Sequence, residues 1–239
     1  MRMSKKPMKR AERVEVVYDK KRWELLKQLR SKTIQLMEML DSCHLQSIVH
    51  GSITRGDVSE TSDIDLFMPD PPSSFVIETA LERSGFQVYQ RTIIQATPLY
   101  ALKGYIELDP QTSLSFPLVK LRPVEKDFYR FGGEASLSAL KEEERVPGVD
   151  KRLMLIEPTT EGHVENAVVG REEDVANLLG VSLNTVLDRV RALLRRDEVG
   201  RTGVFIEKEL APDETFEQAM KKLADQNPAV RRRIKFYQK

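Results

Sequence analysis

Two aspartates in the stretch Ser62–Met68 have the type and spacing needed to bind a divalent cation. Asp63 and Asp65 are separated by one residue in a segment where acidic and apolar side chains alternate. On a strand this spacing places both carboxylates on one face, about 7 Å apart, and directs Ile64 and Leu66 to the opposite face. Mg²⁺ prefers oxygen ligands and commonly binds one or two carboxylates together with the phosphates of a substrate. The pair therefore predicts a site for one or two divalent cations.

A glycine–serine turn lies twelve residues before Asp63. Gly51 and Ser52 follow the short apolar run Leu45–Val49. A turn of this kind that opens a helix presents backbone N–H groups and a hydroxyl to an anion. Glycine suits the position because a Cβ would hinder the close approach of a phosphate. Arg55 lies one turn further on and can face the same anion. Together with the carboxylates, this turn indicates chemistry on a nucleoside triphosphate.

The stretch from His50 to Phe67, HGSITRGDVSETSDIDLF, resembles the signature of the nucleotidyltransferases of the DNA polymerase β superfamily. That signature is an apolar residue with Gly-Gly or Gly-Ser, a short spacer that often contains Arg-Gly, and Asp-x-Asp on the next strand. The sequence is similar to archaeal-type members with a minimal nucleotidyltransferase domain. The similarity extends over about residues 20–120.

The resemblance implies a Mg²⁺- or Mn²⁺-dependent enzyme that transfers a nucleoside monophosphate from a triphosphate such as ATP to an acceptor and releases pyrophosphate. Asp63 and Asp65 would be catalytic and hold two metal ions, one activating the attacking hydroxyl and the other neutralising the triphosphate. Gly51, Ser52 and Arg55 would bind the nucleotide. The acceptor would be RNA, DNA or a protein. Small members of the superfamily also include halves of toxin–antitoxin pairs, which is a further alternative.

The sequence departs from the family where a third carboxylate is needed on a later strand. In the predicted hairpin Tyr100–Val119, Ser115 falls at that place. Glu107, between two apolar residues, and Asp109, at the start of the turn, are the alternatives as third metal ligand, although turn formation alone also explains Asp109. If neither serves, the alternative function is a catalytically degenerate regulator that senses a nucleotide and binds DNA.

Helical and strand periodicities along the first half of the chain predict an α+β fold. A helix with its apolar residues at spacings of three and four precedes the glycine turn, and a second helix ends at Gly85. The hairpin follows. The predicted elements are a helix over Lys21–Leu40, strands over Leu45–Val49 and Asp63–Met68, a helix over Phe75–Ser84, and strands over Phe86–Ile94, Tyr100–Leu108 and Leu114–Val119.

The segment Asp174–Leu194 resembles a helix-turn-helix, with Gly180 in the turn. Val199–Ile206 predicts two short strands around glycines, which would form the wing of a winged helix. Arg189 and Arg191 would then lie exposed on the second helix and Arg201 on the wing, where they could contact nucleic acid. Winged helices also serve as protein-interaction modules, so that role stays open.

These patterns predict four segments. They are a basic, flexible arm over 1–18, a polymerase-β-like nucleotidyltransferase domain over 19–125, a connecting region over 126–168, and a winged helix-turn-helix with a basic C-terminal helix over 169–239. Residues 1–34 carry 12 Lys or Arg and 4 Asp or Glu, whereas residues 35–184 carry 13 and 24. Basic segments attract phosphate backbones, but a solvated tail explains them equally well.

Composition limits the class of protein. The 239 residues carry a net charge of +1 and are 40% hydrophobic and 31% charged, which excludes collagen-like and wholly disordered chains. The single cysteine, Cys43, excludes an internal disulfide framework. No apolar run reaches the length of a membrane span, and the N-terminus lacks the core of a signal peptide. We expect a cytoplasmic protein with no membrane partner, and a homodimer is compatible with the sequence.

Overall fold

The computed structural model describes residues 13–200 and 203–236, which divide into two compact units. Of the described residues, the first unit contains those up to Ile34, Val49–Ser62 and those from Lys126 to Gly200. The second contains Gln35–Ile48, Asp63–Glu125 and those from Gly203 onward. Helices and mixed sheets occur in the chain, so the predicted α+β class is confirmed. The long helix α1 (Lys20–Ser42), predicted over Lys21–Leu40, contributes residues to both units.

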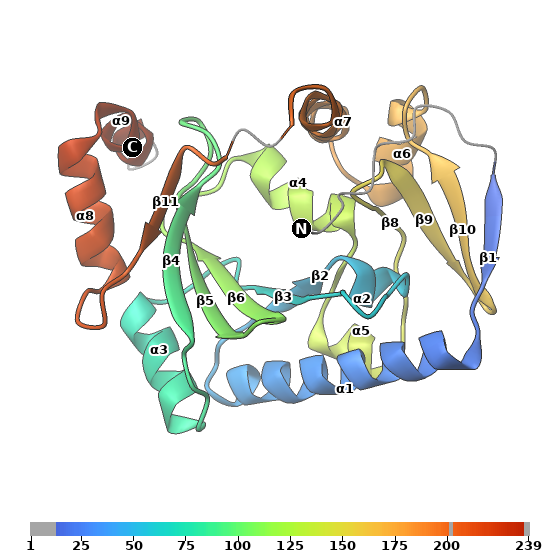
Figure 1. The fold of residues 1–239 in the computed structure, drawn as a ribbon, viewed down its shortest axis with the longest axis horizontal. Helices are drawn as coiled ribbons and strands as arrows, with labels where there is room; N and C mark the ends of the chain where they lie inside the picture. Colours follow the sequence, from blue (N-terminus) through green and yellow to red (C-terminus); the bar gives the residue numbers. More distant parts are fainter. Residues whose placement is uncertain (1–12, 201–202, 237–239) are drawn as a thin grey trace. The chain divides into compact units, whose positions relative to one another are not determined.

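The first unit contains an antiparallel sheet in the order β1-β10-β9-β8 and several short helices (Figure 1). Its elements are wholly or mostly β1 (Val14–Val17), β2 (Ile48–His50), α2 (Ser52–Arg55), α4 (Pro123–Gly132), β7 (Glu134–Ala135), α5 (Leu137–Lys141), β8 (Gly148–Val149), β9 (Met154–Thr159), β10 (Gly162–Ala167), α6 (Glu172–Leu179) and α7 (Leu183–Val199). Residues 126–168, predicted as a connecting region, supply helices and most of this sheet.

The prediction of a flexible arm over 1–18 is wrong for residues 13–18, the part of this segment that the structure describes. Val14 to Val17 form β1, which pairs antiparallel with β10, and the backbone N–H of Tyr18 donates to the carbonyl of Glu161. The prediction rested on the basic charge of the segment. It did not take into account that the β-branched valines favour an extended backbone. Residues 1–12 lie outside the described residues.

The two helices predicted on either side of Gly180 are present in the first unit. Gly180 ends α6 in the left-handed conformation with φ 61°, and the Ser182 side chain accepts a hydrogen bond from the backbone N–H of Thr185 at the start of α7. The apolar faces of the two helices pack in one core with side chains of α4, β8 and β9. The members of that core are Phe131, Val149, Leu153, Leu155, Val168, Val175, Ala176, Leu179, Val186, Val190 and Leu193.

The second unit is a mixed sheet with helices. Its strands run in the order β11-β4-β5-β6-β3, with β3 and β6 parallel and the other neighbours antiparallel. The elements are β3 (Ile64–Phe67), α3 (Ser74–Arg83), β4 (Gln90–Gln95), β5 (Lys103–Asp109), β6 (Thr112–Pro117), β11 (Ile206–Glu209), α8 (Phe216–Gln226) and α9 (Pro228–Phe236). The predicted hairpin of β5 and β6 is confirmed.

The predicted wing is wrong. Val199 ends helix α7, and Ile206 begins β11, which pairs antiparallel with β4 of the second unit. Arg201 and Thr202 lie outside the described residues. The predicted domain 169–239 is therefore divided between the two units, because its last strand and helices complete a different sheet.

One face of the second unit's sheet is apolar and forms its core. Ile64, Leu66, Ile106, Leu114 and Phe116 are at most 1% exposed. The ring of Phe216, on α8, packs edge-on against that of Phe116 at 5.1 Å between centroids. The close packing needs a residue without a side chain at Gly104, where a Cβ would lie 2.7 Å from the Phe116 ring and 2.9 Å from the Phe216 ring.

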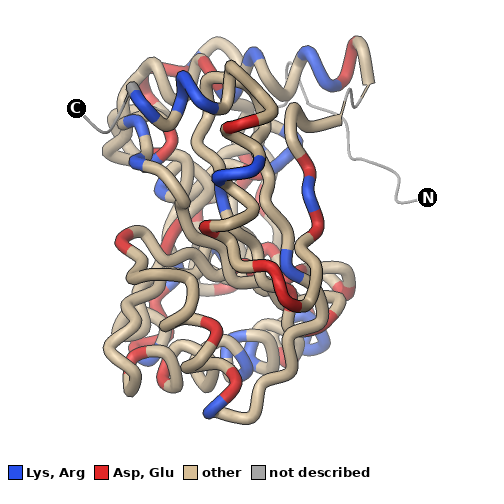
Figure 2. The backbone as a smooth tube through the Cα atoms, turned by 90° about the vertical axis from the view of Figure 1, so that its left-hand side faces the viewer, with Lys and Arg blue, Asp and Glu red and all other residues tan. Residues whose placement is uncertain are grey.

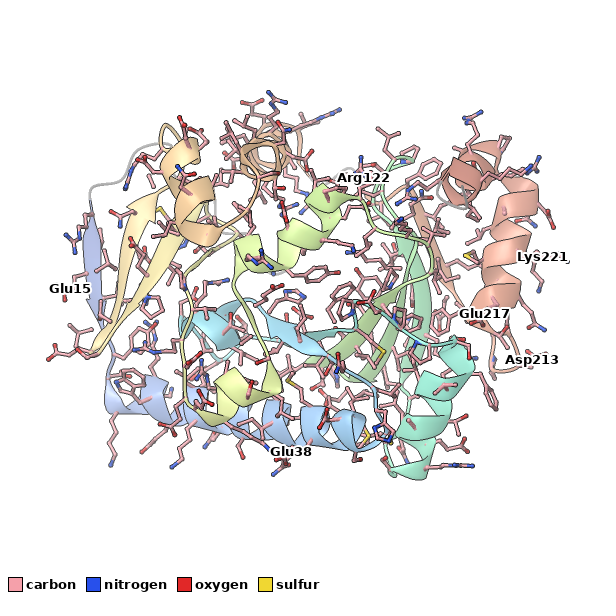
Figure 3. The ribbon with its side chains drawn as sticks, turned by 180° about the vertical axis from the view of Figure 1, so that it is seen from behind. Glu15, Glu38, Arg122, Asp213, Glu217 and Lys221 are labelled. Carbon is pink, nitrogen blue, oxygen red and sulfur yellow. The ribbon has the colours of Figure 1, made fainter. Side chains whose placement is uncertain are left out.

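Two carboxylates fix the helices of this unit. Glu217, on α8, accepts hydrogen bonds from the backbone N–H and the hydroxyl of Ser74 and so caps α3 (Figure 3). Glu125 is 1% exposed and accepts hydrogen bonds from the Ala101 N–H and from the guanidinium groups of Arg122 and Arg233, the latter on α9. Removing either carboxylate leaves buried donors without their partners, which is costly.

The last two helices carry many basic residues, coloured blue along the tube that leads to the C-terminus in Figure 2. Lys221, Lys222, Arg231 and Arg232 are exposed, whereas Arg233 is buried. Lys222 pairs with Glu214, and Arg231 donates to carbonyls at the end of α8. Within the described residues, no helix has both the length and the apolar character required to cross a bilayer.

We predict that Gly104→Ala lowers the free energy of unfolding by about 1–3 kcal/mol, because the new methyl group overpacks the Phe116–Phe216 contact. Gly132→Ala is the matched control, since a Cβ there meets no atom within 4 Å. Chemical denaturation followed by circular dichroism measures both. Equal stability of the two variants would contradict the prediction.

Candidate active site

The carboxylate pair lies as the sequence predicts. Asp65 is in β3 and Asp63 immediately precedes it, and both side chains are half-buried. The intervening Ile64 and the following Leu66 are 1% and 0% exposed. The alternation places the two aspartates on the face of the sheet opposite the apolar core.

The strand register sets a polar row beside Asp65. Asp65 pairs with Ser113 of β6, and Ser113 pairs in turn with Glu107 of β5. Directly paired residues on adjacent strands project to the same face. The Ser113 hydroxyl donates a hydrogen bond of 3.0 Å to Oδ1 of Asp65. This contact engages one of the two carboxylate oxygens of Asp65.

Ser115, expected where the family carries its third carboxylate, lies one row further along. It pairs with Phe67, and its hydroxyl donates to the carbonyl of Leu66 at 3.1 Å. It is 5% exposed. The residue opposite Asp65 is Ser113, so the position next to the aspartate pair also carries a serine. The sequence alone does not identify Ser113 as the neighbour of Asp65, because it does not define the register of β6 against β3.

The two alternatives for a third metal ligand differ in their surroundings. Glu107 lies in the same row as Asp65 with one strand between them, which is about 10 Å between Cα atoms. Asp109 lies beyond a bulge and its carboxylate accepts a hydrogen bond from the backbone N–H of Gln111 in the hairpin turn. This hydrogen bond supports a turn-forming role for Asp109. Of the two alternatives for a third metal ligand, Glu107 is therefore the one that we keep.

The donor set fits one Mg²⁺ better than two. Within the described ranges, no three side chains of His, Cys, Asp or Glu form a group that could hold a metal ion. Asp63 and Asp65 are nevertheless hard oxygen donors on one face, which suits a Mg²⁺ that takes its remaining ligands from substrate phosphates and water. The residues thus fit a cation delivered with a nucleotide.

Tyr105 of β5 also faces this side of the sheet, one row away from Asp65 and Glu107. Burial, together with the negative charge of Asp65, raises the pKa of Tyr105 to about 12. The phenol therefore stays protonated at neutral pH and retains a hydrogen-bond donor beside the carboxylates. The sequence does not single out Tyr105, because tyrosine is common in strands whatever their function.

Gly51 and Ser52, in the first unit, open the short helix α2. Gly51 adopts φ +93°, and a Cβ at this position would meet no atom within 4 Å, so the space beside its backbone is open. Its N–H donates to the carbonyl of Gly133, which also accepts from the Thr54 hydroxyl. The Ser52 hydroxyl donates to that of Ser62 at 3.1 Å. The helix that follows, α2, spans only Ser52–Arg55.

Arg55 does not have the predicted nucleotide-binding role. Its guanidinium makes a two-pronged contact with Asp57 at 2.9 and 3.0 Å and also donates to the carbonyl of Gly132. The Arg55 and Asp57 side chains are 6% and 13% exposed. All three contacts hold the guanidinium within the protein, because its charge needs a partner once it is buried. Arg55 therefore positions the glycine turn rather than binding a phosphate.

One of the predicted nucleic-acid contacts, Arg189, packs against α4. Arg189 is half-buried, and its guanidinium lies over the ring of Phe128 at 4.8 Å from the centroid. Phe128 and Tyr129 in turn contact the ring of His50 edge-on. Asp127 accepts hydrogen bonds from the Ser182 N–H and the Thr185 hydroxyl, so the start of α7 is docked on α4.

Arg191 is exposed on α7, as predicted. Arg201 lies outside the described residues, so its predicted contact is not described by the structure. The exposed side of α7 also carries Arg195, followed by Asp197 and Glu198. Opposite charges at this end reduce the net attraction that the helix exerts on a phosphate backbone.

A second polar cluster lies in the first unit, around His163 of β10. His163 is 2% exposed, and its ring nitrogens lie 2.6 Å from the Tyr18 hydroxyl and 3.1 Å from Glu165. Burial alone would raise the pKa of Glu165, but hydrogen bonds from Arg152 and His163 hold it below its ordinary value. The cluster links Tyr18, which follows β1, to β10 and leaves His163 almost no exposed surface for a ligand.

Comparison with models of known protein families finds no match for this chain. A search of the curated proteins finds no match either.

We predict that Arg55→Met lowers the free energy of unfolding by about 3–5 kcal/mol, because it leaves the buried Asp57 carboxylate unpaired. Arg171→Met is the matched control, since the pair Arg171–Asp174 is exposed and contributes about 1 kcal/mol or less. Urea denaturation of both variants tests this. A loss at Arg55 no larger than that at Arg171 would restore the ligand-binding interpretation of Arg55.

We predict that stability falls above pH 10 because of two tyrosines. Burial raises the pKa of Tyr18 to about 12, and Tyr105 has the same value. Each phenol stays protonated in the folded state while it ionises in the unfolded state, so its contribution is present below pH 10 and is lost as the pH rises to 12, at about 1.4 kcal/mol per pH unit. Denaturation between pH 8 and 11 shows a shallower decline for Tyr105→Phe. Tyr89→Phe, at a 72% exposed position, keeps the slope of the unmodified protein.

Proposed function

We propose that the chain is a Mg²⁺- or Mn²⁺-dependent nucleotidyltransferase that transfers a nucleoside monophosphate from a triphosphate to an acceptor and releases pyrophosphate. The observation that carries the proposal is the pair of half-buried aspartates on one face of β3, preceded at a spacing of twelve residues by a glycine turn with open space beside Gly51. The sequence signature around these residues supports the same chemistry.

Each residue has a role that its surroundings support. Asp63 and Asp65 would hold the cation, and the Ser113 hydroxyl orients Asp65 toward it. Bound Mg²⁺ would supply positive charge to the phosphates and the leaving pyrophosphate. Ser52, in the first unit, begins α2 and is half-buried, whereas Ile53 is 0% exposed, so of these two only Ser52 offers polar groups to a ligand. The positive φ of Gly51 aims the chain into that turn.

The second candidate is a nucleotide-binding regulator without transfer activity. It is favoured by Ser113 and Ser115, which occupy the positions of β6 paired with Asp65 and Phe67. A site that binds one cation and a nucleotide, but lacks a third carboxylate to assist the attacking hydroxyl, retains binding and loses rate. The helix pair α6–α7 would then be the part that contacts DNA or a protein, through exposed residues such as Arg191.

We also propose that the acceptor is a nucleic acid or a protein and that the chain acts in the cytoplasm. The basic residues of α8 and α9 support a phosphate-bearing acceptor. The single cysteine supports a reducing compartment, since disulfide frameworks mark oxidising ones. Pairing of two copies and a toxin–antitoxin partner are tested by mass measurement and by co-expression.

We predict that Asp63→Asn and Asp65→Asn each reduce transfer to about one hundredth or less, because each removes a charged cation ligand while preserving shape. The protein is incubated with α-labelled nucleoside triphosphates, Mg²⁺ or Mn²⁺, and an extract that contains RNA, DNA and protein acceptors. Asp70→Asn, at an exposed carboxylate outside the strand, is the matched control and retains full transfer.

The outcomes separate the two candidates. Label that depends on Asp63 and Asp65 supports the enzyme, and its position in the extract identifies the acceptor class. Metal-dependent nucleotide binding without label from any triphosphate supports the regulator. Transfer that persists unchanged in both aspartate variants would falsify the proposed role of the carboxylates.

A further inference from the structure

The antiparallel sheet of the first unit has two edges, and they differ in length and exposure. β8, at one edge, is two residues long and buried, whereas β1, at the other, has four residues, Val14–Val17 (Figure 1). Among the described strands, β10 is the one that pairs with β1. The opposite side of the β1 backbone therefore has no neighbouring strand in the described part of the chain. An edge of this kind is a template on which another chain can pair.

The hydrogen bonds to β10 show which backbone groups of β1 point outward. The N–H of Tyr18 donates to the carbonyl of Glu161, so the backbone of Tyr18 is directed toward the hairpin that β10 forms with β9. This direction alternates from residue to residue along an antiparallel strand. The backbone of Val16 is therefore directed toward β10 as well, whereas Glu15 and Val17 direct their N–H and C=O groups away from it.

The side chains of β1 do little to protect this edge. Val14 and Val17 are 45% and 63% exposed, and Glu15 is the one charged residue of the strand. The edge strand β11, also four residues long, has charged side chains at every position except Ile206. Natural proteins protect sheet edges with charges, prolines or bulges. β1 contains no proline, and its register against β10 is continuous. It thus has the features of a strand that accepts another.

The outward groups of β1 are complementary to those of a second copy. When two β1 strands run antiparallel about a two-fold axis at Val16, Glu15 of each copy lies opposite Val17 of the other. These pairs exchange hydrogen bonds in both directions, and Val16 faces its counterpart at the non-hydrogen-bonded position between them. The same register sets Arg13 of one copy opposite Asp19 of the other, and both residues are exposed. Opposite charges at directly paired positions stabilise a strand pair.

The neighbouring registers are less favourable. An axis at Glu15 would place the two copies of this carboxylate opposite each other, and an axis at Val17 would place Glu15 opposite Asp19. Like charges at directly paired positions are destabilising. An axis at Val14 would leave Val17, the more exposed of the two valines, beyond the described part of the other strand. The charges of the edge therefore favour the axis at Val16.

We propose that two copies of the chain associate through β1, with the strands antiparallel about a two-fold axis at Val16. The sheets of the two first units then form one continuous sheet. A pair of four-residue strands adds a small interface, so the dimer is reversible and dissociates on dilution. The proposal does not depend on the proposed function, since it uses neither the aspartates nor the glycine turn.

Disulfide trapping on the full chain tests the register. In a Cys43→Ser background, Val16→Cys places two thiols at directly opposed positions whose Cα atoms are about 4.5 Å apart, within the range of a disulfide. Val14→Cys is the matched control, because its two copies are about 13 Å apart along the strands. We expect mild oxidation to give a covalent dimer with Val16→Cys and about a tenth as much or less with Val14→Cys. Random collision would favour Val14→Cys, because Val14 is the more exposed position.

Sedimentation equilibrium measures the contribution of the backbone. Val17→Pro removes an outward N–H from each copy and leaves the hydrogen bonds to β10 in place, so we expect the dissociation constant of the dimer to rise about tenfold or more. Val17→Thr keeps the N–H and the β-branched shape, and we expect it to dimerise like the unmodified protein. Melting temperatures followed by circular dichroism check that both variants are folded.

Three outcomes would overturn the proposal. One is an unmodified protein that stays monomeric up to about 1 mM. Another is equal cross-linking of Val14→Cys and Val16→Cys, and the third is equal association of Val17→Pro and Val17→Thr, since the copies then meet through another surface or register. None of these measurements uses a nucleotide, so a failure of the proposed transfer activity leaves this inference unaffected.

Discussion

The parallel pairing of β3 with β6 is the constraint on which the candidate site depends. It places Ser113 beside Asp65 and, through the β5–β6 hairpin, aligns Glu107 and Tyr105 with the same face. A slip of one residue in this register would send those side chains into the apolar core and bring Leu114 out to the aspartates. The packing of Phe116 against Phe216 opposes such a slip, so the core on one face determines the chemistry available on the other.

Buried arginines organise the loops around both units. Arg30 donates to the carbonyls of Ile53, Thr54 and Glu144, and burial lowers its pKa to about 10. Arg145 donates to the carbonyls of Thr159 and Gly162, and Arg233 to those of Leu99 and Lys120. A guanidinium has five N–H donors in a rigid fork, so one side chain can donate to several backbone carbonyls at once. Arg55 is one more member of this pattern.

The sequence predicts the local elements well because periodicity and turn residues are local signals. α1, β3, the β5–β6 hairpin and the α6–α7 pair lie close to their predicted positions. The alternation of acidic and apolar residues from Asp63 to Leu66 is also a local signal, and the burial of Ile64 and Leu66 agrees with it. What it does not predict are partners distant in the chain: Asp57 and Gly132 for Arg55, Phe128 for Arg189, Ser113 for Asp65, and β4 for β11. A basic side chain has the same appearance in a sequence whether its charge faces a ligand or a carboxylate of the protein.

The pairing of β11 with β4 also determines which strand forms the edge of this sheet. β11 is the outermost strand in the order β11-β4-β5-β6-β3, and its residues Ile206–Glu209 are mostly charged. Charged side chains on an edge strand discourage a second chain from adding to the sheet. β4, which β11 covers, has the sequence QRTIIQ and lacks that protection over Ile93 and Ile94. β11 therefore covers the edge of β4. A chain truncated before Ile206 would expose the unpaired backbone groups of β4, to which a strand of another chain could pair.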